Sequence, residues 1–124
     1  MKEWKIKVYQ DENCDFFDWR DGLPPKAKAR FDNILDYLEI TKILSGTSYV
    51  KQLRGYDGIY EIRFIVNNIQ YRPLGCYGPE RKTFVLLIGA IEQGDSFIPK
   101  TAPWKAAKRK SKIFKDRRYI SEYY

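Results

Sequence analysis

Two arginines that a tight turn would bring face to face are the residues of this chain best suited to chemistry. Residues 60–71 read Y-E-I-R-F-I-V-N-N-I-Q-Y, and Arg72 follows directly. Asparagine tolerates positive φ, so Asn67 and Asn68 fit a two-residue hairpin turn. The register of that hairpin places Arg63 opposite Arg72. Like charges in that position destabilise a sheet, so the pair indicates a docked anion, and the net charge of +7 favours phosphate.

The arginine pair has two interpretations. Two guanidinium groups on one sheet surface can hold a phosphate bidentately and stabilise the charge that develops during its cleavage. Alternatively, Glu61 and Gln70 neutralise Arg63 and Arg72 in an ordinary surface network. The spacing alone leaves both interpretations open.

Further basic residues flank the hairpin. Lys51 and Arg54 precede it, and Arg81 and Lys82 stand at the turn that follows it. Together with the two arginines they would form a basic concavity suited to a nucleic acid. Tyr77, near that turn, is free to stack on a base. For any single lysine or arginine of this set, a solvated side chain is the simpler interpretation.

Composition excludes several kinds of chemistry. The chain has 124 residues, two cysteines and no histidine, which excludes histidine-based acid–base catalysis and histidine metal ligands. Two isolated cysteines do not build a zinc site, so we expect no metal, no cofactor and reduced thiols. The length predicts a single domain over residues 1–124. No run of about 18 apolar residues exists, so we expect no membrane contact and a cytoplasmic location.

The elements that would position these residues follow from hydrophobic periodicity. Alternation predicts a half-buried strand over residues 4–9, and the aromatic stretch 14–19 predicts a helical turn. After Pro24 and Pro25, which suit a helix start, apolar spacing predicts one amphipathic helix to about Lys42. A β meander follows, with strands expected at 60–66, 69–77 and 83–91 and an irregularity at Pro73.

The C-terminal segment holds most of the excess charge. Residues 105–124 carry a net charge of +6, against +1 for the rest of the chain. After a loop over residues 93–103, we expect a helix on which Trp104, Ala107 and Phe114 share a buried stripe. The segment is either an electrostatic arm for nucleic acid or a solvated helix that packs on the body.

Three stretches of the chain resemble a known family. They are K-Q-L-R-G-Y-D-G-I-Y-E-I-R-F (51–64), Q-Y-R-P-L (70–74) and F-V-L-L-I-G-A-I-E (84–92). They are similar to the RelE/ParE toxin superfamily, in particular to the phage-derived, HigB-like branch of type II toxin–antitoxin systems. The residues that carry the signature are Leu53, Gly55, Glu61, Arg63, Tyr71 and Arg72. The resemblance implies an α+β fold with an N-terminal strand and helices packed on a twisted antiparallel sheet, closed by a C-terminal basic helix.

The resemblance also implies a function. Many members of the superfamily are ribosome-dependent endoribonucleases that cut mRNA without a metal, by attack of a ribose 2′-OH on the adjacent phosphate. Arg63 and Arg72 match the positions of the family's catalytic cations, so Arg72→Ala would abolish cleavage in a folded protein. The implied partners are mRNA, the ribosome and a cognate helix-turn-helix antitoxin.

One departure from the family pattern keeps other functions open. Many members carry Lys-Lys or Lys-Arg after the central strand, where this chain has E-Q-G-D at 92–95. Lys100 is the candidate substitute, and Lys100, Tyr77 and Glu61 are candidates for proton transfer. The alternatives are a gyrase poison like the ParE branch, which is not an enzyme, and an inactive phage-derived module that binds nucleic acid or an antitoxin.

Overall fold

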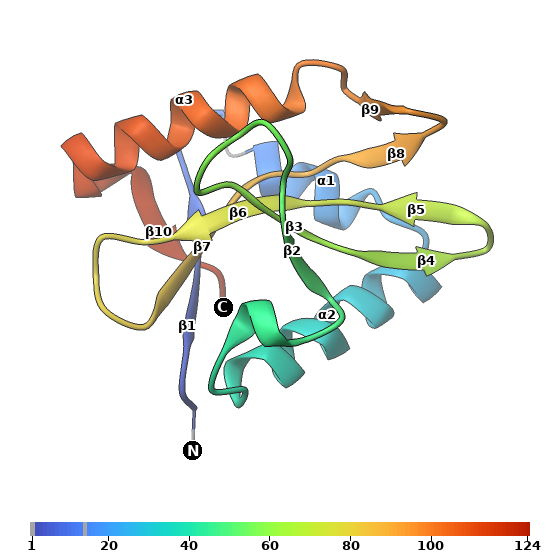
Figure 1. The fold of residues 1–124 in the computed structure, drawn as a ribbon, viewed down its shortest axis with the longest axis horizontal. Coiled ribbons are helices and arrows are strands. Elements are labelled where there is room, and N and C mark those ends of the chain that lie inside the picture. Colours follow the sequence, from blue (N-terminus) through green and yellow to red (C-terminus); the bar gives the residue numbers. More distant parts are fainter. Residues whose placement is uncertain (1, 14) are drawn as a thin grey trace.

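The computed structural model describes residues 2–13 and 15–124 (Figure 1). Cys14, where the expected aromatic turn begins, lies outside the described residues. The helices are α1 (Asp15–Asp21), α2 (Pro25–Glu39) and α3 (Ala102–Lys115), with short 3-10 turns η1 (Leu44–Gly46) and η2 (Arg117–Tyr119). The strands are β1 (Lys5–Tyr9), β2 (Val50–Gln52), β3 (Tyr60–Ile62), β4 (Phe64–Val66), β5 (Ile69–Tyr71), β6 (Leu74–Tyr77), β7 (Thr83–Ile88), β8 (Ile91–Gln93), β9 (Ser96–Ile98) and β10 (Ile120–Glu122).

The strands form two sheets. The larger has the order β10-β1-β7-β6-β3-β2, and the smaller has the order β4-β5-β8-β9. The α+β class is confirmed. However, β1 pairs with β7 in parallel, which differs from a purely antiparallel sheet. A parallel pair needs a long crossover connection, and here α1, α2 and the meander between the two strands supply it.

Two hydrophobic cores lie on opposite faces of the sheets. On one face, Phe16 of α1 and Phe31 of α2 pack with strand residues such as Phe84. On the other face, Ala106 and Ile113 of α3 pack with residues of β6 and β7. We call these the α1/α2 face and the α3 face, and Figure 1 shows α2 and α3 on opposite sides of the sheets. Coverage of both faces explains why β7 is buried along its whole length and apolar after Thr83.

The expected hairpin is present, but each of its strands is interrupted. Asn67 and Asn68 have φ of 51° and 65°, and Phe64 pairs with Tyr71 in the expected register. At Arg63 and Arg72 the two strands stop pairing with each other. The Arg63 amide donates to the Tyr49 carbonyl at 2.7 Å, and the Arg72 amide donates to the Ala90 carbonyl at 2.8 Å. The expected strands 60–66 and 69–77 therefore split into β3 with β4 and β5 with β6, so the hairpin runs from one sheet into the other.

The region before α3 corrects a second prediction. Residues 93–103, expected to be a loop, contain the second half of a hairpin formed by β8 and β9. Gly94 supplies the positive φ of 62° at its turn. Glycine adopts this conformation without steric penalty, so a short polar stretch closes a hairpin where the sequence pattern predicts a loop.

The buried side of α3 also differs from the expected one. Trp104 and Phe114 are each 52% exposed, whereas Ala102, Ala106 and Ile113 are buried. Small alanine side chains let the helix approach the sheet closely, which a bulky indole in their place would prevent. After α3 the chain returns to pair β10 with β1. Among the described residues, no helix has the length and hydrophobicity that a bilayer crossing needs.

Candidate functional site

The two arginines lie where the sheets join, and both belong to the α3 face. Ile62 and Phe64, on either side of Arg63, are buried in the core of the α1/α2 face. Tyr71, which precedes Arg72, is buried in the same core. Because successive side chains of a strand point to opposite faces, Arg63 and Arg72 share the α3 face. The hairpin register thus produces the juxtaposition that the sequence pattern indicates.

Arg72 is a buried cation whose two terminal nitrogens donate hydrogen bonds within the protein, whereas its buried Nε has no hydrogen-bond partner among the described residues. The residue is 3% exposed. Its Nη1 donates to the Tyr71 carbonyl at 2.9 Å and its Nη2 to Gln70 Oε1 at 2.6 Å. Its Nε lies 3.6 Å from Glu92 Oε1. Burial, and then the positive charge of Arg63, lower the pKa of the Arg72 guanidinium. Arg72 is therefore a fixed charge within the wall of the site.

Arg63 is the more accessible partner. Its side chain is 39% exposed, and its Nε lies 3.4 Å from Glu61 Oε1. Burial raises the pKa of the Glu61 carboxyl, although the positive charges of Arg63 and Arg72 act in the opposite direction. Lys51 lies opposite Glu61 on the neighbouring strand β2. Acidic and amide side chains thus do neutralise the arginines, as the second interpretation of the sequence expects. However, they leave part of Arg63 open to solvent.

A hollow of about 400 Å³ opens beside Arg63. The residues that line it are Arg30, Ser48, Tyr49, Arg63, Phe64, Ile65 and Arg72. Three guanidinium groups and no carboxylate occur among these described lining residues. Guanidinium and hydroxyl donors suit a phosphate group, although Glu61 and Glu92, just outside the lining, lie 3.4 Å from Arg63 and 3.6 Å from Arg72 and compete for them.

Arg30 is a member of the site that sequence analysis did not find. It lies on the exposed side of α2, where its Nη2 is 3.4 Å from Tyr49 Oη and its guanidinium lies 5.6 Å from the centre of the Tyr49 ring. Tyr49 in turn accepts the Arg63 amide through its carbonyl. No local pattern around Arg30 signals this role, because only the packing of α2 beside β2 and β4 brings it to the hollow.

The structure separates Tyr77, Arg81 and Lys82 from the arginines. Tyr77 faces the α1/α2 side, where its ring lies 5.3 Å from Trp4 and 5.6 Å from Phe84 between ring centres. Lys82 Nζ lies 5.0 Å from the centre of the Trp4 ring. The turn that joins β6 to β7 and the tip of the β4–β5 hairpin stand at opposite ends of the molecule (Figure 1). These three residues do not complete one concavity with Arg63 and Arg72.

The other three expected residues occupy different places. Lys51 adjoins the pair through Glu61, and it is exposed. Arg54 lines a separate hollow in the loop between β2 and β3. Lys100 is exposed on the connection between β9 and α3. Of the four residues expected to position RNA, Lys51 is therefore the one that lies next to the arginine network, opposite Glu61.

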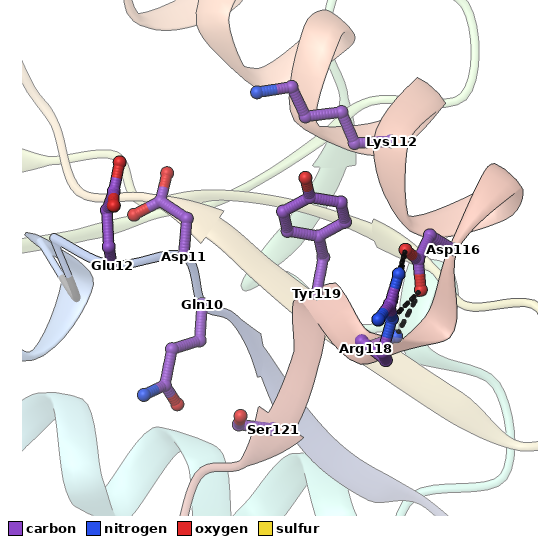
Figure 2. A pocket seen from close by; sticks show the side chains of 8 residues that line it. All are labelled: Gln10, Asp11, Glu12, Lys112, Asp116, Arg118, Tyr119 and Ser121. Carbon is purple, nitrogen blue, oxygen red and sulfur yellow. Dashed lines mark hydrogen bonds and ion pairs between the residues drawn. The ribbon is translucent and has the colours of Figure 1, made fainter.

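A larger pocket at the C-terminal end of α3 contains groups of both charges. Its volume is about 600 Å³, and it is lined by Gln10, Asp11, Glu12, Lys112, Asp116, Arg118, Tyr119 and Ser121 (Figure 2). Arg118 Nη2 lies 2.8 Å from Asp116 Oδ2 within it. Acidic and basic groups are mixed on its walls, so it lacks the uniform charge of the arginine hollow. Among the described residues, no group of three or more acidic, cysteine or histidine side chains is placed to hold a metal ion.

Comparison with known proteins assigns the chain to a family. A search of curated proteins and a search of solved structures each found no match. The family model for Phage derived protein Gp49-like (DUF891) matches residues 18–111, a span that includes the arginine hollow and most of α3. Proteins of this family are often toxin-like and occur in toxin–antitoxin systems. Since the match covers well over half of the sequence, the chain belongs to the Gp49-like family of phage-derived proteins.

Proposed function

We propose that this protein is the toxin of a type II toxin–antitoxin system and that it cleaves mRNA on the ribosome without a metal. The observation that supports this proposal most directly is the hollow lined by Arg30, Arg63 and Arg72. A site of this positive charge suits the scissile phosphate of RNA, because that phosphate gains negative charge as the reaction proceeds. The partners are mRNA, the ribosome and a helix-turn-helix antitoxin, whose binding would cover this basic region.

The proposed chemistry is an internal transfer at phosphorus. The ribose 2′-OH loses its proton to the Glu61 carboxylate, and its oxygen attacks the adjacent phosphate while the bond to the 5′ oxygen breaks. A raised pKa makes the Glu61 carboxylate a better proton acceptor near neutral pH. Arg63 and Arg30 contact the phosphate, and the positive charge of buried Arg72 stabilises it electrostatically from within the wall of the site. The departing 5′ oxygen takes up a proton, for which Lys100 is the candidate donor.

Arg63→Gln is the substitution that tests this proposal best. Arg63 is partly exposed, so its replacement leaves the fold intact, whereas Arg72→Ala would also remove a buried side chain. We expect Arg63→Gln to lower the rate of RNA cleavage on translating ribosomes by about 10²- to 10³-fold and to relieve growth arrest. Lys26→Gln is the matched control, because Lys26 is exposed on α2 and its substitution changes the net charge equally.

Equal cleavage by Arg63→Gln and the Lys26→Gln control would contradict the proposal. DNA breaks without RNA cleavage would identify a gyrase poison instead. The measurement is the mapping of RNA cut sites on translated messages, together with growth after induction without the antitoxin gene.

A second candidate function is an inactive module that binds an antitoxin or nucleic acid. Glu92 favours this function. Its Oε1 lies 3.6 Å from Arg72 Nε, and many members of the superfamily that the chain resembles carry a basic residue at this point of the sequence. A carboxylate at this place opposes the binding of a phosphate. Unaffected growth and no RNA cleavage by the unmodified protein would support this function.

A further inference from the structure

α3 carries a second basic surface, which is separate from the arginine hollow. Lys105, Lys108, Lys112 and Lys115 succeed one another at intervals of three or four residues, so they lie along one side of the helix. All four are exposed. We call these four residues the lysine stripe. At a rise of 1.5 Å per residue the stripe extends over roughly 15 Å.

The other basic residues of α3 show that the helix is not uniformly charged on all sides. Arg109 Nη2 lies 2.6 Å from Asp15 Oδ2, and its Nη1 donates to the Leu87 carbonyl at 2.8 Å. Lys110 Nζ lies 3.5 Å from the Asp57 carbonyl. These two side chains hold α3 to the rest of the protein. The basic residues of one helix thus divide into a structural side and an outward side.

The lysine stripe forms no direct ion pair with a carboxylate among the described residues, although Lys112 shares a pocket with Asp11, Glu12 and Asp116. The ion pairs that lysines form in the described part of the chain involve Lys2, Lys7 and Lys28, and none of these belongs to the stripe. Like charges three or four residues apart destabilise a helix by about 0.2–0.5 kcal/mol per pair. The stripe contains three such neighbouring pairs, so it works against the stability of α3.

The helix dipole explains only half of the stripe. Lysines near a helix C-terminus are stabilised by the dipole, which accounts for Lys112 and Lys115. Lys105 and Lys108 lie in the N-terminal half, where the dipole disfavours a cation, and the first turn holds no acidic residue. Lys108 Nζ is also held 4.2 Å from the centre of the exposed Trp104 ring. An external polyanion would compensate this arrangement.

The chemistry of the stripe favours nucleic acid over a membrane or a protein. A membrane-bound helix inserts an apolar face, but the apolar face of α3, with Ala102, Ala106 and Ile113, is already buried in the protein. Protein interfaces are depleted of lysine at their centres. A straight line of solvated lysines instead matches the regularly spaced phosphates of a nucleic-acid helix, which lysine contacts as a point charge.

We propose that the lysine stripe binds the phosphate backbone of double-helical RNA. The choice of RNA over DNA rests on the proposed function. The stripe contacts phosphates without reading sequence, and it holds the protein on a structured RNA while the arginine hollow takes a single strand. Its contribution to affinity falls as salt rises, because each contacted phosphate releases counterions.

The test compares two triple variants of the full chain. Lys105→Gln/Lys108→Gln/Lys115→Gln removes three stripe charges and leaves Lys112, which lies 5.7 Å from the centre of the Tyr119 ring. The control is a second triple variant that removes the same net charge from exposed lysines elsewhere, namely Lys5→Gln/Lys26→Gln/Lys42→Gln. The probe is a fluorescent RNA duplex of about 16 base pairs, and its dissociation constant is measured across a range of salt concentrations.

We expect the stripe variant to bind less tightly and its plot of log affinity against log salt to be less steep by about 2 to 3. The control should retain the slope of the unmodified protein. Equal slopes for the two triple variants would overturn the proposal. So would equal binding of a DNA duplex of the same sequence, or tighter binding of anionic vesicles or a polyglutamate peptide.

This binding assay is independent of cleavage. If the unmodified protein binds the RNA duplex through the stripe but cuts no message, the proposed function fails and the stripe assignment stands. If it cuts messages while the triple variants bind the duplex alike, the stripe assignment fails and the proposed function stands.

Discussion

The arginine hollow and the lysine stripe are both basic, but they present their charge in opposite ways. Arg63 and Arg72 are ordered by Glu61, Gln70 and Glu92, and Arg72 is nearly inaccessible. The lysines of the stripe are exposed and form no ion pair with a carboxylate of the described residues. The first region fixes a few donors in defined positions, whereas the second offers exposed point charges along a line. Fixed donors suit one phosphate, and a line of point charges suits several.

This difference has a consequence for stability. A buried charge depends on its partners, so its removal disturbs the fold. An exposed lysine is solvated in both the folded and unfolded states, so its removal changes binding and alters stability only by the like-charge repulsion that it relieves, about 0.2–0.5 kcal/mol per pair. Substitutions in the two regions should therefore separate stability from affinity, and the expected effects on stability run from Arg72 down to the outer side of α3.

Among the substitutions of charged residues, Arg72→Ala should have the largest effect. We expect the free energy of unfolding to fall by roughly 3 kcal/mol, because the substitution leaves Glu92 and Gln70 without their buried partner. Lys105→Ala should change it by no more than about 0.5 kcal/mol. Urea denaturation of both variants measures this difference. Equal stability of the two would mean that Arg72 is less dependent on its partners than its burial indicates.

Arg109→Gln should have the next largest effect. Its guanidinium makes charge-assisted bonds to Asp15 and a bond to the Leu87 carbonyl, and loss of such bonds should lower the free energy of unfolding by about 2 kcal/mol. Lys108→Gln, on the neighbouring position of the same helix, is the control. Thermal unfolding of both variants distinguishes the inner side of α3 from the outer side, and similar melting temperatures would argue against that distinction.

Glu61→Gln should have a smaller, pH-dependent effect. Burial raises the pKa of the Glu61 carboxyl above its ordinary value of 4.5, so the folded state holds this proton more tightly than the unfolded state does. The protonated Glu61 carboxyl makes its full contribution to the free energy of unfolding below pH 4.5. This contribution is lost as pH rises through the raised pKa. Relative to the unmodified protein, Glu61→Gln should thus gain stability from pH 4 to pH 7. A constant difference across this range would show that the pKa is not raised.

The smallest effect should come from Trp104→Ala. Trp104 is half exposed, so we expect a change within about 0.5 kcal/mol, whereas Ile113→Ala, at a fully buried position of the same helix, should lower stability by about 2–5 kcal/mol. Chemical denaturation of both variants makes the comparison. A large loss of stability in Trp104→Ala would instead support the sequence-based prediction that Trp104 belongs to the buried side of α3.

The hairpin shows how far local sequence determines structure. Asn67 and Asn68 fix the turn, and the turn fixes the register, so the juxtaposition of Arg63 with Arg72 follows from a dozen residues. The interruption of both strands at these arginines does not. It depends on the carbonyls of Tyr49 and Ala90, which belong to other parts of the chain.

In α3, by contrast, tertiary packing rather than local sequence decided which side chains are buried. Its helical spacing and its excess of positive charge are present in the sequence. The sequence pattern placed Trp104 and Phe114 on the buried side, because bulky aromatic residues usually supply the apolar face of a helix. Packing selected alanines instead, since only small side chains allow the close approach of α3 to β6 and β7.

The sequence by itself determined the hairpin register, the absence of histidine chemistry and the concentration of charge near the C-terminus, because each depends on residue type or short-range spacing. The α+β class was an expectation that the family resemblance implied. The tertiary structure alone decided that Arg30 joins Arg63, that Tyr77 and the β6–β7 turn lie elsewhere, and that Arg72 is buried. These features depend on contacts between segments distant in the chain, and the free energy of such contacts leaves no mark in local periodicity.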